Sequence, residues 1–370
     1  MKRKLRVGVL FGGRSGEHEI SLISAASVMK ALDRGKYIVL PIGITREGQW
    51  RLGDRALDPP AKALETGRLM TPSADPSGPL LVPADLRSTR STPPGIDVIF
   101  PVLHGTFGED GTVQGLLEMA NVPYVGAGVL ASATGMDKDV MKRLFRDAGL
   151  SVVPWILVLR SEWKREPAAV TQRVLREFDF PVFVKPANLG SSVGISKVHN
   201  RAELAPALNL AARYDRKIIV ERGIDAREIE CSVLGNDNPG ASLPGEVLPI
   251  NEFYDYEAKY IKEGSEIIVP AKLPQFRVQQ IRDFAVRAFT TLDCAGMARI
   301  DFLLDRKWGR LYVNELNTIP GFTPISMYAK MWEASGVPYS KLLDRLIMLA
   351  LERHKEKLRT QLRFAPSAAK

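Results

Sequence analysis

The chain has 370 residues, of which 45% are hydrophobic and 25% charged, so a globular protein of two or three domains is expected. The two cysteines lack metal-type spacing, and no apolar window reaches the ~18–20 residues of a membrane span, so we expect a cytoplasmic protein with free thiols and no membrane partner. The net charge of +9 is spread along the chain without a basic–aromatic motif, so no nucleic-acid partner is predicted.

The first part of the chain alternates between strand and helix patterns. Its strands are continuously apolar, which is typical of a parallel, doubly wound sheet that is buried on both faces. The predicted strands cover residues 5–11, 37–44, 96–103 and 122–125, and the predicted helices cover residues 19–32 and 112–119. The stretch 49–94 is rich in Pro, Gly and Asp and has weak periodicity. It is predicted to be a surface excursion outside the core.

A glycine motif follows the first part. Gly126, Gly128 and Ala131 match the dinucleotide-binding fingerprint G-x-G-x-x-A. That fingerprint belongs to the first strand–helix unit of a fold, whereas the strand before Gly126 is late and short. We interpret the segment as a connection between domains.

The rest of the chain predicts two α+β modules. Strands are predicted at 151–159, 180–184, 197–198, 217–221 and 228–234, after a helix that starts at Gly135. The last part contains a helix at 275–292, a hairpin and a closing helix at 339–354. The predicted domains are 1–135, 136–230 and 231–356, followed by a disordered tail at 357–370.

The hairpin is the most informative segment. Two apolar runs flank a polar turn, and if this turn is symmetric about Trp308, Asp301 lies opposite Glu315. Arg299 then lies opposite Asn317, so two carboxylates and an amide oxygen share one face. Opposed carboxylates repel unless a cation lies between them, and hard oxygen ligands suit Mg²⁺. The alternative is a solvated hairpin with charged cross-strand pairs.

A second group of residues suggests a nucleotide site. The Gly/Ser-rich segment 190–194 would let backbone N–H groups approach phosphate oxygens, although an ordinary hairpin turn is the alternative. Lys185 ends the buried strand before it and favours the phosphate-binding interpretation. Glu221 and Glu228 lie at strand ends, where acids could bind adenine and ribose or simply be solvated. Lys138 is uninformative by itself.

In this order, these residues resemble an ATP-grasp ligase, and further motifs are similar to those of the D-alanine–D-alanine ligases. The motifs are Gly12-Gly13-Arg-Ser-Gly-Glu17-His-Glu19, His104-Gly105 with Gly108-Glu-Asp-Gly, Met136-Asp-Lys138, Tyr256-Glu-Ala-Lys259-Tyr260 and Asn317-Thr-Ile-Pro-Gly321. The resemblance runs from about Val7 to Leu349. It implies an ATP-grasp fold with an N-terminal doubly wound parallel-sheet domain, a central α+β domain and a C-terminal α+β domain.

The resemblance also implies an activity. Two D-alanines would be ligated to D-alanyl-D-alanine through a D-alanyl phosphate, with ATP converted to ADP and phosphate, for peptidoglycan precursor synthesis. Two Mg²⁺ ions per site, replaceable by Mn²⁺, and a homodimer are implied as well. The alternatives are a D-alanine–D-lactate ligase, another ATP-grasp carboxylate–amine ligase, and a non-enzymatic nucleotide-binding protein on a decayed fold. The presence of Tyr260 favours the peptide product over the ester.

Residue roles follow from the same resemblance. The expected ATP contacts are Lys138, Lys185, Ser192, Val193, Glu221, Glu228 and Lys259. The expected metal ligands are Asp301, Glu315 and Asn317. The first D-alanine would be held by Glu19 and His104, and the second by Ser326 and Met327. Arg299 and the backbone N–H of Gly321 would stabilise the tetrahedral oxyanion. A hydrogen-bonded set of Glu19, Ser191 and Tyr260 would join the first domain, the phosphate loop and a lid at 256–271.

Overall fold

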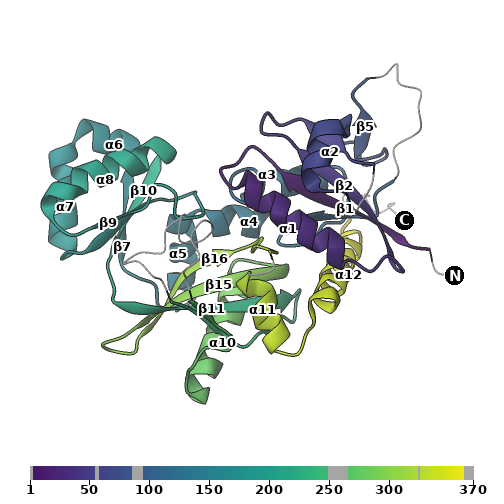
Figure 1. The fold of residues 1–370 in the computed structure, drawn as a ribbon. Coiled ribbons are helices and arrows are strands. Elements are labelled where there is room, and N and C mark those ends of the chain that lie inside the picture. Colours follow the sequence, from purple (N-terminus) through teal and green to yellow (C-terminus); the bar gives the residue numbers. More distant parts are fainter. Residues whose placement is uncertain (1–2, 55–57, 86–94, 249–265, 324–325, 362–370) are drawn as a thin grey trace, which may run out of the picture.

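The computed structural model describes residues 3–54, 58–85, 95–248, 266–323 and 326–361, and the structural statements below concern these residues. Three sheets organise the chain, each in its own lobe (Figure 1). The N-terminal lobe and the middle lobe lie side by side above the third lobe in this view. Among the described residues, no helix is both long and apolar enough to cross a membrane.

The first sheet has the strand order β5-β4-β3-β2-β1-β6. Its centre is parallel, as predicted, because β1 (Leu5–Gly12) pairs in parallel with β2 (Tyr37–Ile44) and with β6 (Val98–Pro101). Helix α1 (His18–Ala31) connects β1 to β2, and α3 (Thr112–Met119) follows β6. The carboxyl ends of β1 and β6 lead into the loops that carry Glu17 and His104.

The prediction that residues 49–94 form a surface excursion is wrong for the part that the structure describes, residues 49–54 and 58–85. Strands β3 (Trp50–Leu52), β4 (Arg68–Pro72) and β5 (Leu81–Pro83) extend the first sheet in antiparallel fashion, and α2 (Pro60–Thr66) packs on β2. Leu52, Met70 and Leu81 are buried in the core of this lobe. Strands of three to five residues are too short to show a hydrophobic period, which explains why the sequence pattern did not indicate them.

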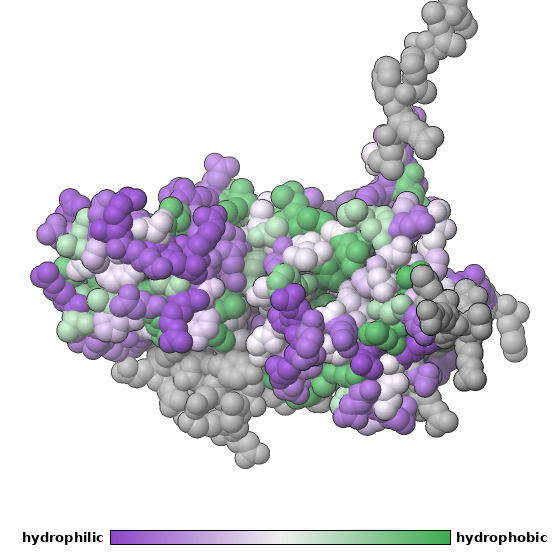
Figure 2. Space-filling view, turned by 90° about the horizontal axis from the view of Figure 1, so that it is seen from above, coloured by the Kyte–Doolittle hydropathy of each residue, from purple (hydrophilic) through white to green (hydrophobic). Residues whose placement is uncertain are grey.

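The middle lobe contains an antiparallel sheet of order β7-β10-β8-β9, which agrees with the predicted α+β module. Its strands are β7 (Trp155–Leu159), β8 (Val182–Pro186), β9 (Ser196–Val198) and β10 (Lys217–Arg222). Its helices are α6 (Arg160–Arg165), α7 (Pro167–Glu177) and α8 (Arg201–Tyr214). The sheet and helices enclose their own hydrophobic core, and hydrophilic side chains cover much of the lobe's outer surface (Figure 2).

The third sheet is antiparallel and has the order β14-β13-β11-β15-β16, with β12 beside β11. Its strands are β11 (Ala226–Gly235), β12 (Gly240–Ala241), β13 (Gly245–Leu248), β14 (Glu266–Ile268), β15 (Gly296–Asp305) and β16 (Leu311–Asn317). One face packs on α4 (Val129–Met136), α5 (Lys138–Asp147) and α10 (Gln275–Thr291). The other face packs on α11 (Met327–Ala334) and α12 (Tyr339–Lys357).

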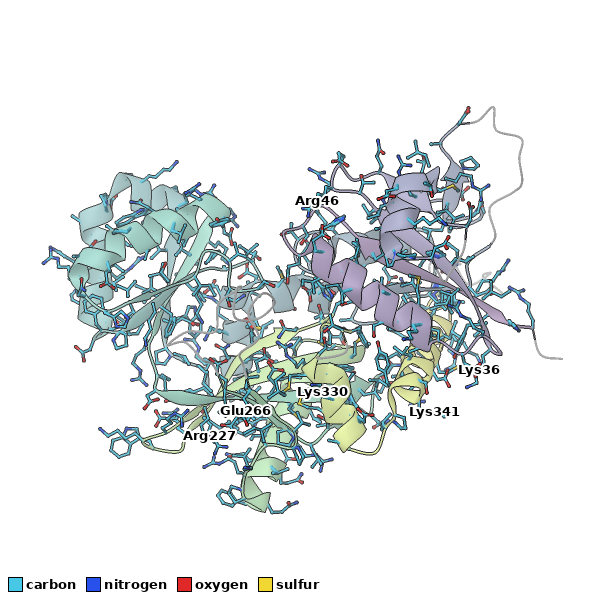
Figure 3. All side chains as sticks on the ribbon, viewed as in Figure 1. Lys36, Arg46, Arg227, Glu266, Lys330 and Lys341 are labelled. Atoms are coloured by element: carbon cyan, nitrogen blue, oxygen red, sulfur yellow. The ribbon has the colours of Figure 1, made fainter. Side chains whose placement is uncertain are left out.

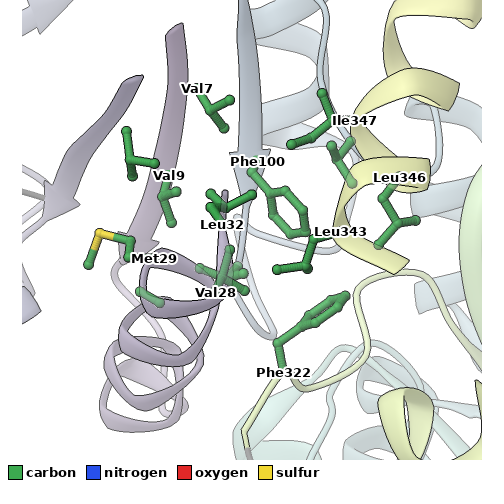
Figure 4. Close-up of a cluster of buried hydrophobic side chains, with 14 of the residues drawn as sticks. Val7, Val9, Val28, Met29, Leu32, Phe100, Phe322, Leu343, Leu346 and Ile347 are labelled. Atoms are coloured by element: carbon green, nitrogen blue, oxygen red, sulfur yellow. The ribbon is translucent and has the colours of Figure 1, made fainter. Parts of the chain in front are cut away.

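The N-terminal lobe and the third lobe share one hydrophobic core (Figure 4). Val7 and Val9 of β1 belong to the same cluster as Leu343 and Leu346 of α12. Phe322, which is fully buried, meets Phe100 of β6 edge to face at a centroid distance of 5.6 Å. The loop after β16 is therefore fixed against the first sheet. The predicted domain limits at 135, 230 and 356 stay predictions, and residues 362–370 of the predicted tail lie outside the described residues.

Replacing Leu346 by Ala should lower the free energy of unfolding by about 2–5 kcal/mol, because a fully buried side chain leaves a cavity in the shared core. Met348 is a matched control on the same helix, since its side chain is 50% exposed and M348A should change stability by less than about 0.5 kcal/mol. Urea denaturation followed by circular dichroism measures both. Equal effects of the two substitutions would contradict the assignment of this core.

Candidate active site

A cavity of about 670 Å³ lies where the three lobes meet, and residues of all three lobes line it. The N-terminal lobe supplies Glu17 and His104, and the middle lobe supplies Lys185 and Ser191. The predicted metal ligands of β15 and β16 line the cavity as well. Residues that are far apart in the sequence therefore face one space.

The predicted hairpin register is confirmed. Asp301 pairs with Glu315 and Arg299 pairs with Asn317, and a bulge follows Asp301. The neighbouring strand β11 places Glu230 opposite Asp301, so three carboxylates stand side by side on adjacent strands. Like charges at such positions repel each other across a sheet.

Arg299 neutralises two of these three acids. Its Nε and Nη2 donate to the two oxygens of Asp301, each over 2.7 Å, and Nε lies 3.0 Å from Glu230. Burial lowers the pKa of the Arg299 guanidinium, but Asp301 and Glu230 outweigh burial and hold it well above its ordinary value. The guanidinium is therefore a fixed positive charge at the wall of the cavity.

The donor set at this wall fits a hard divalent cation. Asp301, Glu315 and Asn317 all line the cavity and offer carboxylate and amide oxygens, which Mg²⁺ prefers. Asn317 Nδ2 donates to Asp301 over 3.0 Å, which fixes the amide and leaves its oxygen for another partner. Among the described residues, no group of three or more His, Cys, Asp or Glu side chains is arranged to hold a metal by itself. A cation here would therefore need further oxygen ligands, such as those of a phosphate.

Lysines face the same wall from two other elements. Lys138 at the start of α5 donates to the carbonyl oxygen of Leu189 over 2.8 Å and lies 3.5 Å from Glu315. Lys185 at the end of β8 forms an ion pair of 2.5 Å with Glu221. Burial lowers the pKa of Lys185, but Glu221 outweighs burial and raises it. Both lysines therefore present positive charge to the cavity.

Glu221 is a buried acid, so the alternative of a solvated acid at the end of its strand does not apply. Its carboxylate is only 3% exposed and pairs with Lys185 and also with Lys142, at 2.6 Å. Burial would raise the pKa of Glu221, but the two lysines lower it to about 2. No role was predicted for Lys142, although its spacing of four residues from Lys138 on a helix indicates a shared face. Glu228, near the start of β11, lines the cavity as well, and its expected contact with the nucleotide stays a prediction.

The Gly/Ser-rich loop is a turn that approaches the N-terminal lobe. Ser191 and Ser192 have φ values of 49° and 58°, in the left-handed region that side chains rarely adopt, and both line the cavity. Val193 lies next to them in the turn. Ser191 Oγ donates to the carboxylate of Glu17. A Cβ atom on Gly190 would lie 3.2 Å from Glu17, so the loop backbone is already close to that acid.

The structure corrects the prediction for Glu19. The Glu19 side chain is 64% exposed and pairs with Arg46 at 2.7 Å, away from the cavity; Figure 3 labels Arg46 on the N-terminal lobe. Glu17 is the acid that faces the cavity and Ser191. Helix α1 begins at His18, so Glu17 precedes the helix, whereas Glu19 lies in its first turn and points to another side. The G-E-H-E motif contains both acids, and the start of the helix distinguishes them.

The loop after β6 supports Glu17. Gly105 has a φ of +72°, and a Cβ atom there would lie 2.5 Å from Glu17 Oε2, so a side chain would strain the backbone and displace the Glu17 carboxylate. The Gly105 N–H donates to Glu109 over 2.7 Å. Burial and the charge of Glu17 raise the pKa of Glu109 to about 8. Glu109 belongs to the quoted G-E-D-G motif, but its position in the cavity wall was not predicted.

His104 is a buried residue of the cavity wall. Its Nε2 lies 3.2 Å from Ser24 Oγ, and its Nδ1 lies 3.2 Å from the carbonyl oxygen of Ile319. Burial lowers the pKa of His104, so the neutral imidazole is favoured. The contact with Ile319 joins the first lobe to the loop after β16.

The loop before α11 closes the remaining side. Gly321, Ser326 and Met327 line the cavity. Ser326 Oγ accepts a hydrogen bond of 2.9 Å from the N–H of Thr323, and a Cβ atom on Gly321 would lie 2.9 Å from it. Lys259 and Tyr260 lie outside the described residues, so their expected roles stay predictions.

Comparison with known proteins gives a consistent result. Residues 6–127 match the family model described as D-ala D-ala ligase N-terminus, and residues 144–348 match D-ala D-ala ligase C-terminus. The chain is 52% identical over 357 residues to a D-alanine–D-alanine ligase of Heliobacterium modesticaldum, covering 96% of this chain and 97% of that one. It is 53% identical over 355 residues to the corresponding ligase of Geobacillus thermodenitrificans, with the same coverage of 96% and 97%.

Solved structures are similar in fold as well. The D-alanine-D-alanine ligase from Coxiella burnetii has a TM-score of 0.84 and 40% identity, covering 97% of each chain. The VanG D-Ala:D-Ser ligase from Enterococcus faecalis has a TM-score of 0.82 and 35% identity, covering 94% of this chain and 100% of that one. The predicted fold class is thereby confirmed, and the chain belongs to the D-alanine–D-alanine ligase family.

Proposed function

We propose that this protein uses ATP to join two D-alanines into D-alanyl-D-alanine for peptidoglycan precursor synthesis. The observation that carries the proposal is the shared cavity. It combines the lysines and the Gly/Ser-rich loop suited to polyphosphate with the oxygen ligands of the hairpin and the Glu17–Ser191 contact. A carboxylate–amine ligase that runs on ATP needs all of these groups in one place.

In the first step, the carboxylate of one D-alanine attacks the γ-phosphorus of ATP. An oxygen–phosphorus bond forms to give D-alanyl phosphate, and the bond to ADP breaks. Lys138 and Lys185 place ammonium groups beside the transferring phosphoryl group, and the 190–194 loop supplies backbone N–H groups. These charges offset the negative charge that develops on the phosphoryl oxygens.

Asp301, Glu315 and Asn317 would hold Mg²⁺, or Mn²⁺ in its place. When bound with ATP, the metal would neutralise charge on the phosphates. Lys138 lies 3.5 Å from Glu315, so the lysine and the predicted metal ligand approach the same phosphoryl group from adjacent elements.

Glu17 is the residue we assign to the ammonium group of the first D-alanine. Its carboxylate faces the cavity and is held by Ser191 Oγ, and Gly105 leaves room for it. The neutral His104 and the Ser326 region lie on the side of the loop after β16, where the D-alanine carboxylates would bind. The assignment replaces the expected role of Glu19.

In the second step, the amine of the other D-alanine attacks the acyl carbon of D-alanyl phosphate. A C–N bond forms, the amine loses a proton, and inorganic phosphate leaves. Arg299 and the N–H of Gly321 would stabilise the tetrahedral oxyanion. Because Asp301 and Glu230 fix the guanidinium, little reorganisation is needed when this charge develops.

We place the reaction in the cytoplasm, which is reducing and supplies ATP, and this agrees with two buried free thiols, Cys231 and Cys294. A homodimer is proposed from family resemblance. Ligation of D-alanine to D-lactate is not favoured by the relatives at about 50% identity. The structural similarity to a D-Ala:D-Ser ligase makes D-serine the competitor to test in the second position.

The function is tested by phosphate release from ATP and Mg²⁺ in the presence of D-alanine, with L-alanine as control and with products identified by mass spectrometry. We expect release that depends on D-alanine and a D-alanyl-D-alanine product. Competition with D-serine and D-lactate measures the specificity for the second substrate. A mixed product with either competitor as the main species would overturn the substrate assignment.

Glu17→Gln should raise the KM for the first D-alanine by about 10- to 100-fold, because a hydrogen bond to a charged group contributes about 1.5–3 kcal/mol. Glu19→Gln is the matched control from the same motif, and its kinetics should stay within about 2-fold of the wild type because Glu19 is exposed. Steady-state kinetics with varied D-alanine measures both. A larger defect in E19Q than in E17Q would restore the original assignment.

Glu315→Gln should reduce Mg²⁺-dependent turnover by about 100-fold or more while the fold stays intact, because an amide binds Mg²⁺ far less well than a carboxylate. Circular dichroism and thermal unfolding verify the fold. Glu333→Gln, at an exposed position of α11, serves as the control and should turn over normally. Turnover of E315Q at the wild-type rate would remove the metal assignment.

A further inference from the structure

Lys142, Glu221 and Lys185 form a buried row of charges behind the cavity. Lys142 Nζ lies 2.6 Å from Glu221 Oε1, and Lys185 Nζ lies 2.5 Å from Glu221 Oε2. The three side chains are 1%, 3% and 12% exposed, so solvent screens them little. The row joins three elements, because Lys142 lies on α5, Glu221 on β10 and Lys185 on β8.

Lys142 is the member of the row that does not reach the substrate. Glu221 and Lys185 line the cavity, whereas Lys142 is absent from its wall in the described part of the chain. Its ammonium lies behind Glu221, 3.4 Å from the carbonyl oxygen of Val153 and 5.6 Å from the centre of the Trp155 ring. Lys142 can therefore influence a bound nucleotide without touching it, through its ion pair with Glu221 and through the charge that it places near Lys185.

The charges in the row explain why a second lysine is needed. Glu221 and Lys185 alone would form a neutral pair, and such a pair attracts a polyphosphate weakly. Glu315 and Glu228 also face Lys185 closely enough to raise its pKa, after the larger opposing effects of burial and Glu221. Lys185 is thus surrounded by acids, and its charge would be largely cancelled if Glu221 had no other partner.

We propose that Lys142 is a positioning residue that occupies one oxygen of Glu221, so that the row keeps a net positive charge and Lys185 can bind nucleotide phosphate. This inference rests on the proposed function, since it assumes that ATP binds in the cavity. In this arrangement Glu221 orients Lys185 without neutralising the site. Lys142 supplies the compensating charge from a place that no substrate enters.

The test compares the binding of ADP and adenosine by isothermal titration calorimetry in Mg²⁺. Lys142→Met should weaken ADP binding by about 10-fold while changing adenosine binding by less than about 3-fold, because only ADP carries phosphates. K142R keeps the charge and should retain the wild-type ratio of the two affinities. A general loss of structure would weaken both ligands and would not change their ratio.

The double variant K142M/E221Q gives the sharpest result. Glu221 is itself an expected contact of the adenosine part of the nucleotide, which ADP and adenosine share, so the test uses the ratio of their affinities. Removing both charges leaves Lys185 with its positive charge, and the ratio of ADP to adenosine affinity should recover to within about 3-fold of the wild-type ratio. Packing damage from the methionine would not be repaired by a change at Glu221. The double variant also replaces the ion pair with uncharged groups, which makes it informative if K142M fails to fold.

Lys217→Met is the matched control. Lys217 is another buried lysine of this region, and it pairs with Asp137 at 2.8 Å and with Asp139 at 3.3 Å instead of a cavity residue. K217M should lower stability without changing the ratio of ADP to adenosine affinity. A changed ratio in K217M would show that the effect is not specific to the row.

The outcomes separate this inference from the proposed function. If the wild type binds ADP and consumes ATP with D-alanine, but K142M keeps the wild-type affinity ratio, only the role of Lys142 is overturned. The same conclusion follows if K142M lowers the ratio of ADP to adenosine affinity and K142M/E221Q does not restore it. If the wild type binds neither ADP nor ATP, the proposed function fails first.

Discussion

The site depends on the electrostatics of three carboxylates placed side by side on β11, β15 and β16. Glu230, Asp301 and Glu315 occupy paired positions, and a sheet tolerates such a row only if cations separate the charges. Arg299 serves Glu230 and Asp301, and Lys138 approaches Glu315 from α5. The sheet therefore requires cations at the same wall where a phosphate would need them. Folding and nucleotide binding therefore both require positive charge at this wall.

Much of this wall could be predicted from the sequence because its determinants are local. The turn around Trp308 fixes the register of β15 and β16, so the pairs Asp301–Glu315 and Arg299–Asn317 follow from counting residues. The bulge after Asp301 was not predicted, and it lies on the turn side of these pairs. Helix α3 and strand β2 also have the predicted bounds, since both are regular segments with clear apolar patterns.

The remaining features depend on tertiary contacts that a single sequence does not reveal. Strands β3, β4 and β5 each bury one side chain in the core of the first lobe, although their own patterns are weak. The choice between Glu17 and Glu19 depends on where α1 begins and on the gap that Gly105 leaves. Lys142 looks like a surface lysine until β10 brings Glu221 to it. Each of these features depends on a contact with a residue from another part of the chain.

The distribution of hydrophobic cores explains why polar contacts help to hold the middle lobe against the other two lobes. The N-terminal lobe and the third lobe share one core, whereas the middle lobe has its own. Polar contacts join the middle lobe's 187–191 segment to the others: Lys138 binds Leu189 and Ala187, and Ser191 binds Glu17. These residues are also those that face the nucleotide and the first amino acid in the proposed reaction. Substrate binding and the position of the phosphate loop therefore rest on the same hydrogen bonds, so a substitution at Glu17 or Lys138 must affect both.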